Sequence, residues 1–328
     1  MQIEERNRPP SSRSVGGVRT REMLLAALAC TVFAAALVLL CASVGALGAS
    51  RNDDWVYYRA LFDIAGGRPF SPNGWSVAFL AGQAYLFLPI VKAFGPSLSA
   101  VQVGVSLLGA AGVWCAYLMF RRFLRIGPSL LSICCLLLGP FFASLSVSFM
   151  TDVPAFALQM LALSLGGMAL RNPRSTVPWL LASLACTTLA FTIREFSVAS
   201  GIAVLGAVIA QERRRATSRT LLLAALSLAW IAILGGLYAW RKGVPGAVEV
   251  ALSIPVVDLP TRVGTIAGVA LSLSLLLVPV VLAIAPLRLA RHAWQRWPLG
   301  VIALGLSVLL LVWWRPPLLP GYLAPQVS

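Results

Sequence analysis

The stretch Val77-Ala-Phe-Leu-Ala-Gly-Gln-Ala-Tyr-Leu-Phe-Leu-Pro-Ile-Val-Lys-Ala-Phe94 decides the fold, because every later segment changes sides if this one crosses a membrane. It is apolar but contains Gln83, Pro89 and Lys92, so its composition leaves the question open. If it does not cross, 17 of the 26 lysines and arginines lie inside and 9 outside, whereas a crossing gives 11 inside and 15 outside. The positive-inside rule therefore favours a re-entrant or juxtamembrane helix.

The composition of the whole chain is that of an integral membrane protein. Hydrophobic residues make up 59% and charged residues 11%, against roughly a quarter charged in soluble domains. The formal charge of +15 comes from short basic clusters between apolar runs, as expected of topology signals. We therefore predict no nucleic-acid partner.

These patterns predict an all-α, polytopic membrane protein with about nine transmembrane helices and an external juxtamembrane or re-entrant helical loop. Residues 1–22 are rich in Pro, Ser, Gly and Arg, which predicts a disordered cytoplasmic tail. Residues 23–328 form a single transmembrane domain whose first external loop covers residues 49–98. The predicted spans are residues 23–48, 99–120, 128–147, 154–170, 177–193, 196–210, 220–239, 264–286 and 299–314.

The first external loop opens with the most charged and aromatic run in the apolar body, Arg51-Asn-Asp-Asp-Trp-Val-Tyr-Tyr-Arg59. Trp55, Tyr58 and Phe62 recur at helical spacing, which predicts an amphipathic helix on the outer membrane surface. Capping of this helix by Asp53 and Asp54 is one explanation of the acidic pair. Capping alone leaves the surrounding aromatic residues unexplained.

Two other turns bring charge to the same predicted face. Thr151-Asp152-Val153-Pro154 begins one span, and Arg194-Glu195 joins two others. Each has an ordinary alternative, a helix start for Asp152 and an interfacial ion pair for Arg194. Together they indicate a reaction in which a carboxylate deprotonates an incoming nucleophile while arginines stabilise a departing phosphate.

The same residues carry a family resemblance. An aspartate pair followed by an aromatic after the first span, a Phe149-Met-Thr-Asp-x-Pro154 helix start, and a re-entrant helix ending in Phe94-Gly95 resemble the GT-C superfamily of polyprenyl-phosphate-sugar-dependent glycosyltransferases. The resemblance covers about residues 20–200 and is to the branch that contains protein mannosyltransferases and lipid A aminoarabinose transferases. It implies inverting transfer of a hexosyl or related sugar, at the external or periplasmic face of the cell (inner) membrane, to a lipid, glycan or protein acceptor.

The resemblance also implies roles for individual residues. Asp53 would be the catalytic base, Asp152 the second acidic position near the acceptor, and Arg194 a ligand of the lipid phosphate. We add Asp54 to the catalytic candidates, and Arg59, Arg241 and Lys242 to the candidates for binding the donor phosphate. The three aspartates are oxygen ligands of the kind that Mg²⁺ or Mn²⁺ prefers, but we assign no metal.

Two other functions remain open from the sequence. One is transport or flipping of a lipid-linked glycan, although the spans hold almost no ionisable groups at mid-depth and no paired broken helices. The other is a non-catalytic membrane subunit whose outer loops hold a partner.

Overall fold

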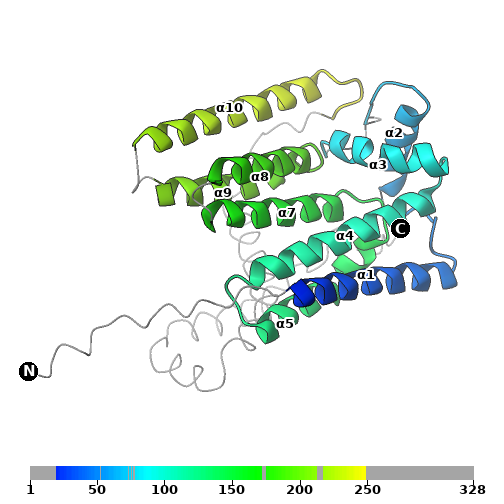
Figure 1. The fold of residues 1–328 in the computed structure, drawn as a ribbon. Helices are drawn as coiled ribbons and strands as arrows, with labels where there is room; N and C mark the ends of the chain where they lie inside the picture. The colour runs from blue at the N-terminus through cyan, green and yellow to red at the C-terminus, as the bar shows by residue number, and fades with distance from the viewer. Residues whose placement is uncertain are drawn as a thin grey trace, which may run out of the picture. The chain divides into compact units, whose positions relative to one another are not determined.

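The computed structural model describes residues 20–248, apart from residues 52, 73, 75, 77, 172–174 and 213–216 (Figure 1). The chain divides into two units, Met1–Val250 and Ala251–Ser328, and the described residues all belong to the first. The predicted spans 264–286 and 299–314 lie outside the described residues. The elements are α1 Thr20–Ser43, α2 Asp54–Ala65, α3 Ala81–Phe94, α4 Leu98–Phe120, α5 Ile126–Leu137, α6 Pro140–Ser146, α7 Asp152–Arg171, α8 Thr176–Phe191, η2 Glu195–Ser197, α9 Val198–Glu212 and α10 Thr217–Lys242.

Helices alone build the described part of the chain, as the sequence predicts. Five segments are long and apolar enough to cross a membrane: α1, α4, α7, Glu195–Glu212 and Arg219–Lys242. The apolar helix α8 is shorter, at 16 residues, and agrees with the predicted span 177–193 within two residues. The protein is therefore a multi-pass membrane protein.

The predicted span 128–147 is wrong as a single helix. The structure replaces it with α5 and α6, which are separated by Leu138 and Gly139. Pro140 supplies no N–H to the helix and disfavours helical geometry in the residue before it. Gly139 accordingly has extended backbone angles, φ −62° and ψ 124°, and Pro140 starts α6.

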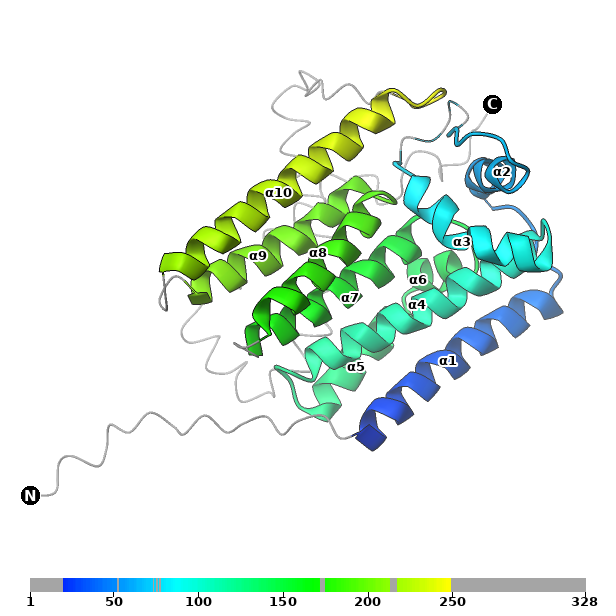
Figure 2. The ribbon, with the colours of Figure 1, turned by 45° about the horizontal axis from the view of Figure 1, so that its top comes forward.

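The central helices pack closely because glycines meet small side chains at their contacts. A Cβ on Gly112 of α4 would lie 2.5 Å from the Cα of Ala157 on α7, and one on Gly109 would lie 2.8 Å from Val153. In a bilayer, where lipid is as apolar as the side chains, such close backbone approach holds helices together. Helix α7 contacts α4, α8 and α9 and so lies at the centre of this packing (Figure 2).

Hydroxyl groups inside the bundle bond to carbonyl groups of neighbouring helices. Ser164 of α7 donates to the carbonyl of Cys115 at 3.0 Å, and Ser183 of α8 donates to that of Ala162 at 2.7 Å. These bonds satisfy polar groups that would otherwise be costly to bury. The outer helices α1 and α10 instead expose large apolar side chains, as expected of surfaces that face lipid.

Helices α2 and α3 both lie at one end of the bundle, which we call the α2–α3 end (Figures 1 and 2). The Gln102 amide near the start of α4 accepts from the Gly48 N–H at 2.8 Å and donates to the Ala49 carbonyl at 3.0 Å. The start of α4 therefore lies beside the segment that follows α1. The chain that connects α1 to α4 thus starts and finishes at the same end of the bundle, the α2–α3 end. Helix α3 has 14 residues, about 21 Å, and is shorter than a bilayer core of about 30 Å. As predicted, the segment 77–94 does not carry the chain across.

Candidate functional site

Helix α3 is fixed to the turn after α8 by two backbone hydrogen bonds. The Leu80 N–H donates to the Ile193 carbonyl at 3.3 Å, and the Gly82 N–H donates to that of Thr192 at 2.9 Å. Leu80 is fully buried and has a φ of 65°, a left-handed conformation that costs a non-glycine residue free energy. The surrounding packing thus holds Leu80 in a strained conformation against the turn that leads to Arg194.

The loop before α3 is fixed to the end of α10. The Ser71 hydroxyl donates to the Pro245 carbonyl at 2.8 Å, and the Gly74 N–H donates to that of Gly246 at 2.8 Å. The Arg241 guanidinium donates to the carbonyl of Ala78 at 3.1 Å. The loop before α3, the turn after α8 and the residues at and after the end of α10 therefore meet at the α2–α3 end.

Asp152 and Arg194 are paired in this assembly. Asp152 stands in the first turn of α7, and Arg194 follows α8. Nη2 of Arg194 lies 3.3 Å from both carboxylate oxygens of Asp152, and the two side chains are 22% and 37% exposed for Arg194 and Asp152 respectively. Arg194 therefore pairs with Asp152 and not with Glu195, the next residue in the chain. Oε1 of Glu195 instead lies 3.7 Å from Nη1 of Arg241. The pair is open enough to meet a substrate.

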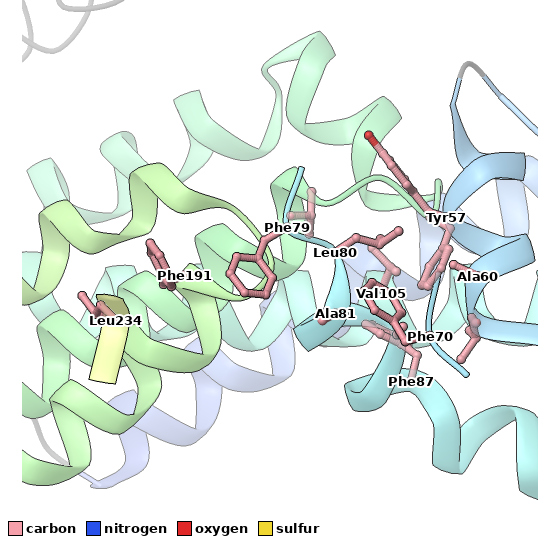
Figure 3. Packing of buried hydrophobic residues seen from close by; sticks show 14 of the residues in the cluster. Tyr57, Ala60, Phe70, Phe79, Leu80, Ala81, Phe87, Val105, Phe191 and Leu234 are labelled. Carbon is pink, nitrogen blue, oxygen red and sulfur yellow. The ribbon is translucent and has the colours of Figure 1, made fainter. Parts of the chain in front are cut away.

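Tyr57 connects this pair to the start of α2. Its side chain is buried, and Figure 3 shows its hydroxyl pointing away from the packed apolar side chains. Burial raises the pKa of Tyr57, the Arg194 charge lowers it, and the charges of Asp53 and Asp152 raise it further. Asp53, Asp152 and Arg194 therefore all lie close enough to act on one hydroxyl. The charges of three of the predicted site residues therefore reach Tyr57.

The role of Tyr57 is missing from the sequence predictions. The predicted helix is confirmed as α2, but the stripe proposed to define it includes Trp55, which is 43% exposed. The side chains that α2 buries follow a second stripe with the same helical spacing, formed by Val56, Tyr57, Ala60 and Leu61. That spacing is visible in the sequence, but the stripe that contains Trp55 has the same spacing, so it does not single out the buried side.

Asp53 and Asp54 have opposite environments. Asp53 occupies the cap position of α2 and is exposed, and its side chain makes no capping hydrogen bond. Its carbonyl instead accepts from the Val56 N–H at 2.9 Å. Asp54 is 0% exposed, and no described group meets hydrogen-bond geometry with either of its carboxylate oxygens. Capping by a side chain therefore explains neither carboxylate.

Burial raises the pKa of Asp54. The backbone N–H groups of Phe149 and Arg51 and the side chain of Gln102 lie near enough to oppose that shift, as does the Arg51 charge, but burial dominates. Removing a carboxylate from water disfavours its charged form. Asp54 thus holds its proton more strongly than an aspartate in water does.

Phe149 places the residues before Asp152 in this interior. Its ring packs edge-on against Phe87 with 5.4 Å between centroids, and its carbonyl accepts from the Gln83 side chain at 2.9 Å. Nearby buried polar atoms in the described residues lack a hydrogen-bond partner, namely Oε1 of Gln83, Oγ1 of Thr151, Oγ of Ser197 and Nε of Arg194. The α2–α3 end therefore contains polar groups that the described residues do not satisfy.

The remaining candidates for the donor phosphate are spread around the site. Arg241 is buried, with its guanidinium 5.7 Å from the centroid of Phe79 and its contacts to Ala78 and Glu195 already described. Lys242 is exposed, with Nζ 5.3 Å from the ring centroid of Tyr238. Arg59 is exposed on α2. The structure pairs Arg194 with Asp152, whereas neither Arg59 nor Lys242 forms an ion pair with an acidic side chain of the described residues.

Metal ligands do not cluster in the part of the chain that the structure describes, where no group of three or more His, Cys, Asp or Glu side chains is placed to hold an ion.

Comparison with known proteins gives one match. The family model described as dolichyl-phosphate-mannose-protein mannosyltransferase matches residues 69–238, more than half of the 328-residue chain. The matched region includes Asp152 and Arg194 and begins after Asp53 and Asp54. No curated protein and no solved structure matches the chain.

Proposed function

We propose a reaction for this chain from the premise that it belongs to the dolichyl-phosphate-mannose-protein mannosyltransferase family. It is a membrane glycosyltransferase of the GT-C type. The donor is a sugar linked to a polyprenyl phosphate, the acceptor is a lipid, glycan or protein, and transfer takes place at the α2–α3 end. Family membership favours this function over lipid-linked glycan transport and over a non-catalytic subunit.

In the proposed step, a hydroxyl or amine of the acceptor attacks the anomeric carbon of the sugar. The new bond forms as the bond from that carbon to the phosphate oxygen breaks, on the opposite face, so the configuration inverts. The electron pair leaves with the polyprenyl phosphate, and the acceptor proton passes to the Asp53 carboxylate. Arg194 stabilises the charge on the departing phosphate through charge-assisted hydrogen bonds.

The observation that supports this proposal most is the contact between Asp152 and Arg194, together with the influence of both charges and of the Asp53 charge on Tyr57. An exposed carboxylate, a second carboxylate and a guanidinium come from α2, α7 and the turn after α8. Asp152 orients Arg194 and lies near the acceptor. The Nε atom of Arg194, which has no partner among the described residues, leaves the guanidinium a further donor for a phosphate oxygen.

The proposed location is the cell (inner) membrane, with the N-terminus in the cytoplasm and the α2–α3 end outside. The charge distribution in the sequence supports this orientation, since it places 17 of 26 basic residues on the opposite side. A polyprenyl-phosphate sugar carried in the membrane then meets its acceptor at the outer surface.

The test is the substitution Asp53→Asn, assayed for sugar transfer in membranes supplied with a polyprenyl-phosphate sugar. A general base typically contributes about 10² to 10⁴-fold, so transfer should fall by at least about 10²-fold with expression unchanged. Asp63→Asn is the matched control, because Asp63 stands on the same helix and pairs with Arg68 at 2.6 Å. Full activity in the Asp53→Asn protein would rule out the base assignment.

A further inference from the structure

Two consecutive arginines at the end of α4, opposite the α2–α3 end, have different surroundings. Arg121 points to α1, where its Nε lies 2.5 Å from the Glu22 carboxylate, and Tyr117 donates to the same carboxylate at 2.7 Å. Arg121 also donates to the carbonyl of Leu124 at 2.6 Å. Its charge is neutralised within the protein.

Arg122 points instead to α7. A Cβ on Gly167 would overlap Nη1 of Arg122, so the guanidinium lies directly against the helix where that glycine leaves room. Arg171 follows Gly167 by four residues and therefore lies one turn further along the same face. The contact continues the line in which α4 and α7 pack through Gly109 and Gly112.

The charges of Arg122 and Arg171 have no acidic partner in the described residues. None of the ion pairs found there includes either residue. Nη1 of Arg122 is buried without a hydrogen-bond partner. Burial lowers the pKa of Arg122, and the Arg171 charge lowers it further. The partial negative charge at the C-terminal end of α7 stabilises the positive charge of Arg171. It does not give Nη1 of Arg122 a hydrogen-bond acceptor.

We propose that Arg122 and Arg171 bind the headgroup phosphate of an anionic phospholipid. Both residues stand just where apolar helices end, which is the depth of the headgroups. One phosphate would accept from Nη1 of Arg122 and from Arg171 and would offset the repulsion between the two guanidinium groups. Phe123 and Met168 are exposed apolar neighbours of the arginines and would contact the acyl chains, which a free phosphate lacks.

The test is lipid binding to the full-length protein purified in detergent. Short-chain phosphatidylglycerol, phosphatidylcholine and inorganic phosphate are titrated separately, while thermal unfolding and native mass spectrometry report stabilisation and the number of bound lipids. We expect phosphatidylglycerol alone to stabilise the wild type. A hydrogen bond to a charged group contributes about 1.5 to 3 kcal/mol, so Arg171→Gln should weaken binding by at least about tenfold.

Matched variants separate binding from folding. Arg125→Gln removes the same charge at an exposed position on the same end of the bundle and should leave binding unchanged. Arg171 is itself exposed, so Arg171→Gln tests the site even if Arg122→Gln fails to fold. Equal stabilisation by phosphatidylcholine, or unchanged phosphatidylglycerol binding in Arg171→Gln, would overturn the proposal. Saturation by inorganic phosphate alone would overturn its assignment to a lipid.

Discussion

Asp53 and Asp54 are chain neighbours that the fold assigns to opposite environments. Asp53 is exposed at the start of α2 and can exchange a proton with a molecule that reaches the surface. Asp54 is enclosed by the interior that contains Phe149 and Gln102. Of these two residues, Asp53 is the one that a molecule at the surface can reach, while the charge state of Asp54 affects the stability of the fold.

The raised pKa of Asp54 predicts a pH-dependent stability. Because the folded pKa lies above the unfolded one, the folded state binds the proton more strongly, and stability decreases as the pH rises through the interval between the two values. We expect Asp54→Asn to raise the Tm above that of the wild type in detergent by more at pH 7 than at pH 4, because pH 4 is near the ordinary aspartate pKa and the wild-type carboxyl keeps more of its proton there. Each kcal/mol recovered at pH 7 should raise the Tm by roughly 2 to 4 °C.

Thermal unfolding at pH 4 and at pH 7 measures this effect. Asp63→Asn provides the reference, because it removes a carboxylate that pairs with Arg68 near the surface of the same helix. An Asp54→Asn protein with the same pH dependence as the wild type would contradict the prediction.

Some of the site could be predicted residue by residue and some could not. Asp152 and Arg194 stand 42 positions apart, but both lie at helix ends that an alternating topology places on one side, so their meeting follows from the order of spans. The burial of Tyr57 does not follow from spacing, because α2 has two apolar stripes and hydrophobicity alone does not say which one packs inward. The raised pKa of Asp54 could not be predicted from its local sequence either, because it follows from burial in the fold and is opposed by the distant residues Phe149 and Gln102.

At the scale of elements, α3 determines where the turn after α8 lies. Its first residues bond to Ile193 and Thr192, one and two residues before Arg194. The strain at Leu80 and the lack of space at Gly82 show that this contact tolerates little displacement. The position of the guanidinium that pairs with Asp152 thus depends on a helix that does not cross the bundle.

Gly82→Ala should therefore reduce both stability and transfer. The added Cβ would overlap the Thr192 hydroxyl and lie 3.0 Å from the carbonyl of Leu189, and overpacking of this kind costs about 1 to 3 kcal/mol. Thermal unfolding and the transfer assay measure the two effects. Gly206→Ala is the comparison, since a Cβ there meets nothing within 4 Å. Wild-type transfer and Tm in Gly82→Ala would show that the contact is not tight.

The interrupted segment α5–α6 shows where hydropathy misleads. Residues 128–147 contain no charged residue and are mostly apolar, so a window of that length predicts one span. The Gly139-Pro140 pair was visible in the sequence and carries the stronger local signal, because its effect on backbone geometry does not depend on the surrounding medium. Hydropathy predicts that a segment is buried in lipid or protein, and not that it is one helix.

The whole described bundle separates charge between its two ends. The carboxylates of Asp53, Asp54, Asp63, Asp152 and Glu195 lie at the α2–α3 end. Glu22 and Glu212 lie at the other end, each paired with an arginine. Arg122, Arg125 and Arg171 add unpaired positive charge there. The sequence predicted this division because charge clusters and apolar runs alternate regularly.

Cysteine labelling tests the orientation of the bundle. In a background without the six native cysteines, Pro69→Cys at the α2–α3 end should react with a membrane-impermeant thiol reagent in intact cells. Phe123→Cys, at an exposed position after α4, should react only once the membrane is permeabilised. The reverse pattern would invert the predicted topology.

The hydrogen bond between Ser71 and Pro245 joins residues 174 positions apart. During synthesis, Ser71 is therefore made well before Pro245. At roughly 5 to 20 residues per second, the ribosome needs about 10 to 35 seconds to reach the second partner after making the first. Until then, the loop before α3 lacks its contacts with the end of α10. A nascent chain paused before α10 should therefore present this loop to proteases, and complete synthesis should protect it.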